Sequence, residues 1–296
     1  MDAVSAIFGL TIREAFRRRL VLAAVVIGVA FVSLHSFALS LLLNHAPCGP
    51  ASRPCHTAYE IVRRTYAINM LALSGVYVAN FLIVMAAVLL PIDTLSGEID
   101  SGIAQTLASK PIRRVDIVLG KWLAHAVMVL AYLLLTAGGL MLAVWLVTHH
   151  IIGIGFVFPR AVSGLSLMLL EALIMMTVSI AGGTRLSTIT NGMIAFGVFG
   201  IAFLGGWLEQ LGELFAQTNV GRLAIRDIGT AISLISPADA IWRLAASQLM
   251  PAFARDLGLT PFTPLLPPSA AMAMWGALYA LAVFALGLRW FYRRAL

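Results

Sequence analysis

Charged residues are scarce in this chain of 296 residues: Asp, Glu, Lys and Arg together account for 11% of the sequence, whereas hydrophobic residues account for 60%. Soluble globular domains carry about 25% charged residues. With a mean hydropathy of +0.95, the composition is typical of a membrane protein and excludes an ordinary soluble domain. The formal net charge of +7 suits anionic lipid headgroups, and without a basic soluble domain it gives no reason to expect a nucleic-acid partner.

The chain also lacks the short motifs of hydrolytic enzymes. No Gly-x4-Gly-Lys-Ser/Thr phosphate loop occurs, and Gly120-Lys121 is followed by Trp122, so the chain cannot hydrolyse ATP through that site. Neither His-Glu-x-x-His nor Gly-x-Ser-x-Gly occurs, which leaves no recognisable metal pair or nucleophile for hydrolysis. We therefore expect no catalytic residue, no metal and no cofactor on this chain.

Six apolar runs are long enough to cross the hydrocarbon core of a bilayer, which is about 30 Å thick. They cover residues 20–43, 68–92, 122–147, 162–183, 189–208 and 270–288. The sequence therefore predicts an all-α integral membrane protein with six transmembrane helices in a single domain, 1–296. We expect no cleaved signal peptide, because the first run is too long for an h-region and follows an amphipathic segment without a small-residue cleavage site.

Basic residues are biased toward one side of these runs. More than half of the 20 Lys and Arg residues lie inside when the N-terminus is placed in the cytoplasm, as the positive-inside rule requires. Both termini are therefore predicted to be cytoplasmic, in a bacterial inner membrane. Residues 2–19 place Phe8 and Ile12 on one helical face and Arg13 and Arg17 on the other, which predicts an interfacial helix. The alternative is a basic flank that only orients the first span.

A polar, charged island at 93–116 separates the second and third runs. Its ordered elements, with the Gly-Lys step that follows, are Gly97-Glu98, Gly102, Ser109-Lys110-Pro111, Arg113-Arg114 and Gly120-Lys121. Their order and spacing resemble the first cytoplasmic loop of type-2 ATP-binding-cassette (ABC) transporter permeases. Many relatives have Thr where this chain has Ile103.

This resemblance implies the permease subunit of an ABC exporter, working as a homodimer or a paired heterodimer in membrane lipid. Separate cytoplasmic ATPase subunits, which hold ATP and magnesium, would dock on the 93–116 loop, and residues 2–19 would form an elbow helix. A short coupling helix from Gly102 to Ser109, opened by Ser101, is expected, with Glu98 fixing the loop. The alternative is a solvated turn that only connects spans. The residues assigned to ATPase coupling are Gly97, Glu98, Gly102, Ile103, Thr106, Leu107, Lys110, Pro111, Arg113 and Arg114.

Residues 209–269 are too polar to span the membrane and too apolar for a free linker, so we expect external helices that lie on the membrane surface or re-enter it. Ser236-Pro237-Ala238-Asp239 predicts a helix start in which Ser236 caps the free amides and Asp239 closes a capping box. The segment also resembles one that precedes the last span in a permease subgroup similar to the nitrous-oxide-reductase maturation permeases.

Polar residues recur inside the predicted spans, where they face protein or water and not lipid. They include Asn69, Tyr77, Asn80, His125, Tyr132 and Glu171. Hydrogen bonding between helices accounts for them, and the lining of a transport path is the alternative. For Glu171, the first interpretation is a neutral carboxylic acid that bonds to a neighbour such as Tyr132 or Thr136.

Two other classes of function stay open at this stage. One is an ion-coupled secondary carrier that uses Glu171, although the absence of a recognisable internal repeat weakens it. The other is a non-transporting membrane anchor or mechanotransmission subunit for an external partner. The sequence does not name a substrate.

Both cysteines, Cys48 and Cys55, fall in the predicted external loop 44–67. An oxidising compartment would bridge them, whereas the neighbouring His45 and His56 leave a zinc or copper site as an alternative. A third possibility is two free thiols. We predict that non-reducing mass spectrometry gives a mass two hydrogens below that of the reduced protein. Free thiols with stoichiometric zinc or copper would instead support the metal site.

Overall fold

The structure is a computed structural model that describes residues 3–45, 58–102, 113–148, 158–215, 219–250 and 268–294. All regular elements in these ranges are helices, as predicted. They are α1 (Ala3–Arg17), α2 (Arg19–His45), α3 (Ala58–Leu89), α4 (Ser96–Asp100), α6 (Arg114–Leu133), η1 (Leu134–Gly138), α7 (Gly139–Thr148), α8 (Phe158–Gly183), α9 (Thr188–Phe215), α10 (Asn219–Ile235), α11 (Ala238–Leu249) and α13 (Ala271–Arg293).

Six helical stretches are long and apolar enough to cross a membrane, which confirms the predicted number. They are Arg19–Asn44, Tyr59–Leu89, Arg114–Thr148, Phe158–Gly183, Thr188–Glu209 and Ala271–Arg293. The second begins at Ala58 and not at residue 68, so part of the predicted loop 44–67 is helical. A helix can extend past the hydrocarbon core into the headgroup region, where charged residues such as Glu60 and Arg63 are tolerated. A search for apolar runs therefore misses the first turns of such a helix.

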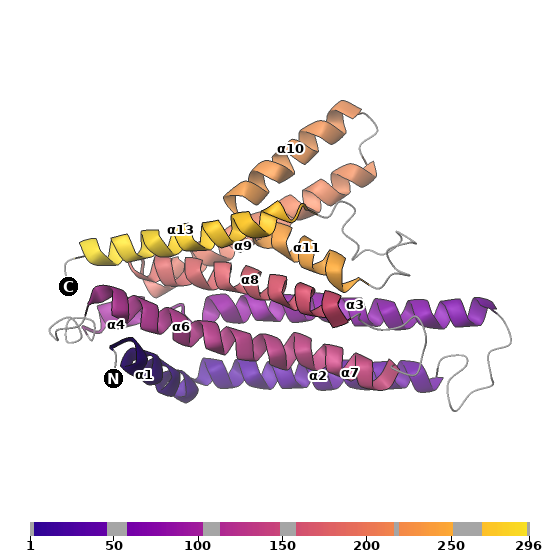
Figure 1. Ribbon diagram of the computed structural model, residues 1–296, viewed down its shortest axis with the longest axis horizontal. Helices are drawn as coiled ribbons and strands as arrows, with labels where there is room; N and C mark the ends of the chain where they lie inside the picture. Colours follow the sequence, from indigo (N-terminus) through magenta and orange to yellow (C-terminus); the bar gives the residue numbers. More distant parts are fainter. Residues whose placement is uncertain are drawn as a thin grey trace.

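The helix α8 is the centre of the bundle. It packs against α3, α6, α9, α11 and α13, and Met168, Ala172, Met175 and Met176 are fully buried along it. By contrast, α2 and α13 lie at the edge (Figure 1) and leave long apolar faces uncovered, such as Leu22 on α2 and Leu278 on α13. Faces of this kind are what a bilayer or a second membrane protein covers.

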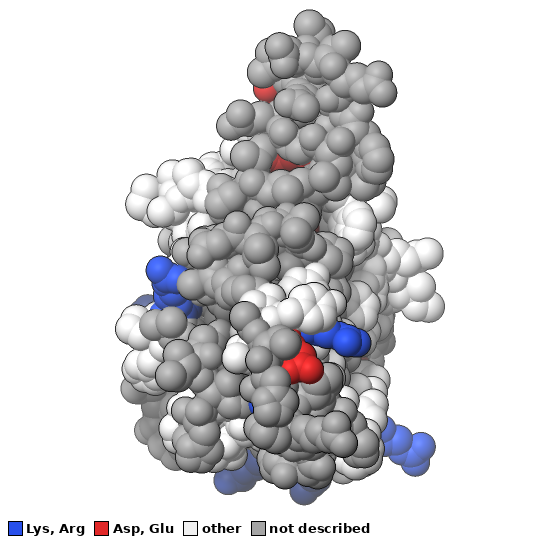
Figure 2. Space-filling model, turned by 90° about the vertical axis from the view of Figure 1, so that its right-hand side faces the viewer, with Lys and Arg blue, Asp and Glu red and all other residues white. Residues whose placement is uncertain are grey.

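The two ends of the bundle differ. Both termini, α1 and α4 lie at one end, whereas α10 and the last turns of α9 project from the other (Figure 1). Figure 2 looks onto the end opposite the termini, where the described Lys and Arg side chains lie apart from one another and not in one continuous patch. The termini therefore share a side with the predicted coupling loop.

The N-terminal helix α1 buries one stripe, formed by Ile7, Thr11 and Ala15, against α6. Of its other apolar side chains, Leu10 and Phe16 are exposed, and Val4, Phe8 and Ile12 are half-buried. The chain turns at Arg18 and continues directly as α2. An amphipathic helix joined to the first span is therefore present, while its position along a membrane surface stays a prediction.

The segment after the fifth span folds as a helical hairpin followed by a buried helix. α10 packs back along α9, and α11 then lies against α8 with nearly all of its side chains buried. This helix re-enters the bundle and does not lie on its surface. The expected capping was wrong: Pro237 precedes α11 without a side-chain cap, and the Ser236 hydroxyl has no partner among the described residues. Asp239 pairs with Arg243 instead, because a buried guanidinium without a carboxylate partner would leave an uncompensated charge.

Because the termini and α4 lie at the same end of the bundle (Figure 1), reporter fusions can test which side of the membrane this end faces. We predict that reporters fused after Ser109, Thr184 and Leu296 give a cytoplasmic signal, because the basic residues of those segments are retained inside. Reporters fused after His150 and Gln217 should give an external signal. An external signal from the fusion after Ser109 would contradict the topology, since the coupling loop would then face away from any ATPase.

Candidate functional site

Of the chain between α3 and α6, the structure describes residues 90–102, which we call the α4 segment. α3 ends just ahead of Pro91, whose ring cannot continue a helix. The short helix α4 follows, and Gly102 ends it with a φ of 75°. This left-handed conformation favours glycine and lets the Gly102 amide donate to the Ile99 carbonyl at 3.2 Å. Ser101 and Gly102 thus close α4. The predicted coupling helix from Gly102 to Ser109 falls almost wholly on residues 103–112, which lie outside the described residues, so it stays a prediction.

A buried ion pair fixes the α4 segment to α6. The Lys121 ammonium lies 2.5 Å from Glu98 Oε1 and is only 2% exposed, and it also donates to the Thr94 carbonyl at 3.1 Å. Removing one partner of such a pair leaves an uncompensated buried charge, which costs about 3–5 kcal/mol. Glu98 is therefore held by the bundle, as the fixing role predicted for it requires.

His125 adds a second link between the same two elements. Its Nδ1 lies 2.8 Å from the Lys121 carbonyl oxygen and its Nε2 lies 3.1 Å from the Thr94 hydroxyl. Because a carbonyl only accepts hydrogen bonds, the proton sits on Nδ1, and Nε2 accepts from Thr94. This geometry agrees with hydrogen bonding between helices, the first of the two interpretations of His125.

Three further contacts tie the α4 segment to the rest of the bundle. The Arg18 guanidinium, at the turn between α1 and α2, bridges Glu14 and Asp93. On the α9 side, the Ser96 and Thr188 hydroxyls lie 2.8 Å apart, and the Asn191 amide donates to the Ile92 carbonyl at 3.1 Å. The segment therefore contacts the α1–α2 turn, α6 and α9 through directional interactions, so it moves with these helices and not as a free loop.

Arg114, one of the residues assigned to coupling, has a structural partner of its own. Its Nη1 donates to the carbonyls of Phe291, Tyr292 and Arg294 at 3.1, 3.0 and 2.9 Å. The last carbonyls of a helix lack partners within it, and a cation satisfies them well. Arg114 thus joins the start of α6 to the end of α13.

A second charged cluster, the α11 cluster, lies at the other end of the bundle and consists of Glu209, Asp239 and Arg243. The Arg243 guanidinium is 4% exposed and lies 2.9 Å from both carboxylates. A Cβ at Gly206 would lie 1.7 Å from Asp239 Oδ2, so only glycine at this position of α9 lets the carboxylate fit. Burial raises the pKa of Asp239 to about 7, against the opposing effect of Arg243.

Comparison with protein families gives one finding that covers nearly the whole chain. The family model described as "ABC-2 family transporter protein" matches residues 5–296. The chain belongs to the ABC-2 transporter family. It is a membrane permease subunit of an ABC transporter, and this membership implies an ATPase component as a partner. Comparison with curated proteins gave no match. The narrower resemblance to nitrous-oxide-reductase maturation permeases stays a prediction.

In this ABC-2 permease, Glu171 lies at the heart of the bundle and is 1% exposed. Neither of its carboxyl oxygens has a hydrogen-bond partner among the described residues, although the Asn80 side chain of α3 is close enough to affect its electrostatic environment. The neighbours first suggested for it are elsewhere: the Thr136 hydroxyl donates to the Tyr132 carbonyl at 2.8 Å, and both side chains lie against Gly28 of α2. That prediction was wrong because helical phase alone does not say which neighbouring helix a polar side chain meets.

The other predicted intramembrane residues are also buried or nearly so. Asn69 is buried on α3, and the Tyr77 ring meets the Trp242 ring of α11 edge to face at 5.0 Å between centroids. With Asn80 and Glu171, Tyr77 places a polar layer between α3, α8 and α11. This layer leads toward the α11 cluster.

Several predicted coupling residues lie outside the described residues, and so do both cysteines. They are Ile103, Thr106, Leu107, Lys110, Pro111, Cys48 and Cys55. Gly97, Glu98 and Gly102 belong to the α4 segment, and Arg113 is the exposed residue just before α6.

The structure adds Lys121, Arg18 and Arg243 to the candidate site residues. Sequence reasoning did not identify these three as site residues. The spacing of Asp239 and Arg243 by four residues on a helix could have indicated their pair. No local signal joins Lys121 to Glu98.

We predict that Lys121→Met lowers the stability of the permease by about 3–5 kcal/mol, because Glu98 then keeps a buried charge without a partner. The double variant Lys121→Met/Glu98→Gln should recover most of the loss. Thermal unfolding of the detergent-solubilised protein measures both. Arg293→Met, at an exposed site of the same end, is the control. A loss for Lys121→Met no larger than for Arg293→Met would contradict the buried pair.

Proposed function

We propose that this permease subunit moves a substrate outward across a bacterial inner membrane, driven by ATP hydrolysis on cytoplasmic ATPase subunits that dock on residues 93–116. ATP and magnesium would be bound by those subunits. The observation that carries the proposal is the buried Lys121–Glu98 pair, at 2.5 Å. It fastens the α4 segment, which leads directly into the proposed docking residues, to the third span.

The proposed mechanism is a rigid-body one. A push on residues 103–112 would reach α4, because the two are continuous in the chain. From α4 the displacement would pass to α6 through Lys121 and His125, and to α9 through Thr188. Packed helices respond to such a push by shifting and rotating as units, since their interiors do not deform continuously.

A second copy of the permease is proposed to complete the pathway. The span Arg19–Asn44 is 11% buried and the span Thr188–Glu209 is 33% buried, against 61% for Phe158–Gly183. These two spans, and Ala271–Arg293 at 11%, therefore offer large apolar faces to lipid or to another permease. Rotation of the coupled helices about a seam between two copies would open and close a path between them.

The test of this proposal is docking. We predict that an ABC ATPase co-purifies with the wild-type permease from the membranes of its source cell. Leu107→Asp should weaken this association by at least about tenfold, equivalent to about 1.4 kcal/mol, because a carboxylate would have to be desolvated in an apolar cleft. Immunoblots of the membrane fraction check that the variant is still inserted.

Arg293→Asp is the matched control, because it adds the same carboxylate at an exposed position of the same end outside residues 93–116. Association of Leu107→Asp equal to that of the wild type would refute docking at this loop. An ATPase that binds but drives no ATP-dependent movement of any substrate would instead favour a mechanotransmission subunit.

A further inference from the structure

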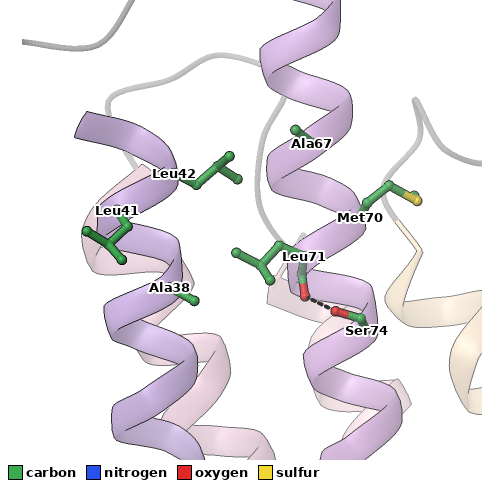
Figure 3. A pocket seen from close by; sticks show the side chains of 7 residues that line it. All are labelled: Ala38, Leu41, Leu42, Ala67, Met70, Leu71 and Ser74. Carbon is green, nitrogen blue, oxygen red and sulfur yellow. Dashed lines mark hydrogen bonds between the residues drawn. The ribbon is translucent and has the colours of Figure 1, made fainter. Parts of the chain in front are cut away.

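An apolar groove separates α2 from α3 at the end of the bundle opposite the termini (Figure 3). Its volume is about 900 Å³, which is in the range of small-molecule binding sites. Leu42 of α2 and Leu71 of α3 point toward each other across it. The lining residues are Ala38, Leu41, Leu42, Ala67, Met70, Leu71 and Ser74.

The groove offers no free hydrogen-bond donor from its lining side chains. Its one polar side chain, Ser74, donates its hydroxyl to the Leu71 carbonyl at 2.7 Å. The side of the groove toward the bundle is built from Leu39, Leu43, Ile68 and Ala72, which pack together with Val144 of α7. An occupant of this groove must therefore be apolar along its length.

The groove closes toward the middle of the two helices. There the His35 ring of α2 lies against Gly75 of α3, so closely that a Cβ at position 75 would come within 2.5 Å of it. Toward the other end of the groove, α2 and α3 pack on the bundle side through Leu39, Leu43, Ile68 and Ala72, while Leu42 and Leu71 face each other across the groove (Figure 3). The groove, which we call the slot, is therefore bounded at its inner end by the contact between His35 and Gly75.

A basic residue, Arg63, lies one helical turn beyond the lining residues of α3. Arg63 precedes Ala67 by one helical turn, so it lies on the same face of α3, about 6 Å farther out. It is exposed and forms no ion pair with another described residue. Its guanidinium is thus available to an anion at the mouth of the slot.

The depth of the slot matches the boundary between acyl chains and headgroups. The first span begins at Arg19, and Leu41 lies about 33 Å farther along the helix at 1.5 Å per residue. The hydrocarbon core is about 30 Å thick. A phospholipid whose acyl chain enters the slot from this level would place its phosphate beside Arg63.

We propose that the slot between α2 and α3 binds one phospholipid of the leaflet at that end, with an acyl chain between Leu42 and Leu71 and the phosphate on Arg63. Arginine recognises phosphate through two parallel hydrogen bonds, and the apolar slot has the complementary chemistry for the chain. The bound lipid covers the apolar side chains that α2 and α3 leave open beside their packed face.

The experiment is native mass spectrometry of the full chain, purified from vesicles of phosphatidylethanolamine and phosphatidylglycerol. The wild type should retain one more phospholipid molecule than Ala67→Trp, whose indole fills the slot. Arg63→Gln should weaken retention by on the order of tenfold, as expected for the loss of a charged hydrogen bond. Val78→Trp is the control, since it adds the same side chain at an exposed position of α3 outside the slot.

Thermal unfolding of each variant shows whether it is folded, and Ser74→Leu provides a second, smaller obstruction. Equal lipid retention by the wild type, Ala67→Trp and Ser74→Leu would overturn the proposal. A lower dimer fraction for Ala67→Trp with unchanged lipid retention would also overturn it, because the slot would then be an interface between two copies of the chain.

Discussion

A buried ammonium group in a membrane-spanning helix is tolerated only beside an anion, and Lys121 satisfies this condition through Glu98. The rest of the inner architecture follows from the pair. Glu98 can reach Lys121 only if the chain after α3 turns back over the end of α6, and this turn brings Thr94 to His125 and Asp93 to Arg18. A polar connection of a membrane protein would ordinarily face water, but here half of it becomes part of the helical bundle.

The two charged clusters occupy opposite ends of the bundle, with a largely apolar core around α8 between them. In both, one buried cation bridges elements that are distant in the sequence: Lys121 joins α4 to α6, and Arg243 joins α11 to α9. Buried pairs of this kind add little net stability, because desolvation offsets their attraction, but they penalise any arrangement that separates the partners. They therefore disfavour movements that would separate the helices they join.

The polar layer of Tyr77, Asn80 and Glu171 lies in the interior of the bundle and leads toward the α11 cluster. It lies where α3, α8 and the re-entrant α11 meet, and the α11 cluster closes it toward the end opposite the termini. A movement of α9 changes the position of Glu209, the partner of Arg243, so the two ends of the bundle are linked through one span. The tight fit of Asp239 against Gly206 makes this link sensitive to small displacements.

The sequence by itself determined the number of spans and the helical class, because length and hydropathy over about twenty residues are decisive in a bilayer. The ordered elements of the 93–116 loop indicated the family and Glu98, and the Ser236-Pro237-Ala238-Asp239 pattern indicated the helix at 238–249. Glu171 was identified as a residue of interest because an acid inside a span is costly. Only the tertiary structure decided what surrounds Glu98 and Glu171. Lys121 was interpreted only as part of a Gly-Lys step, Ser236 as a cap and Thr136 as a neighbour of Glu171, yet each has a different environment in the bundle. The reason is that helical phase fixes which side chains share a face, while the packing of helices far apart in the chain fixes what that face meets.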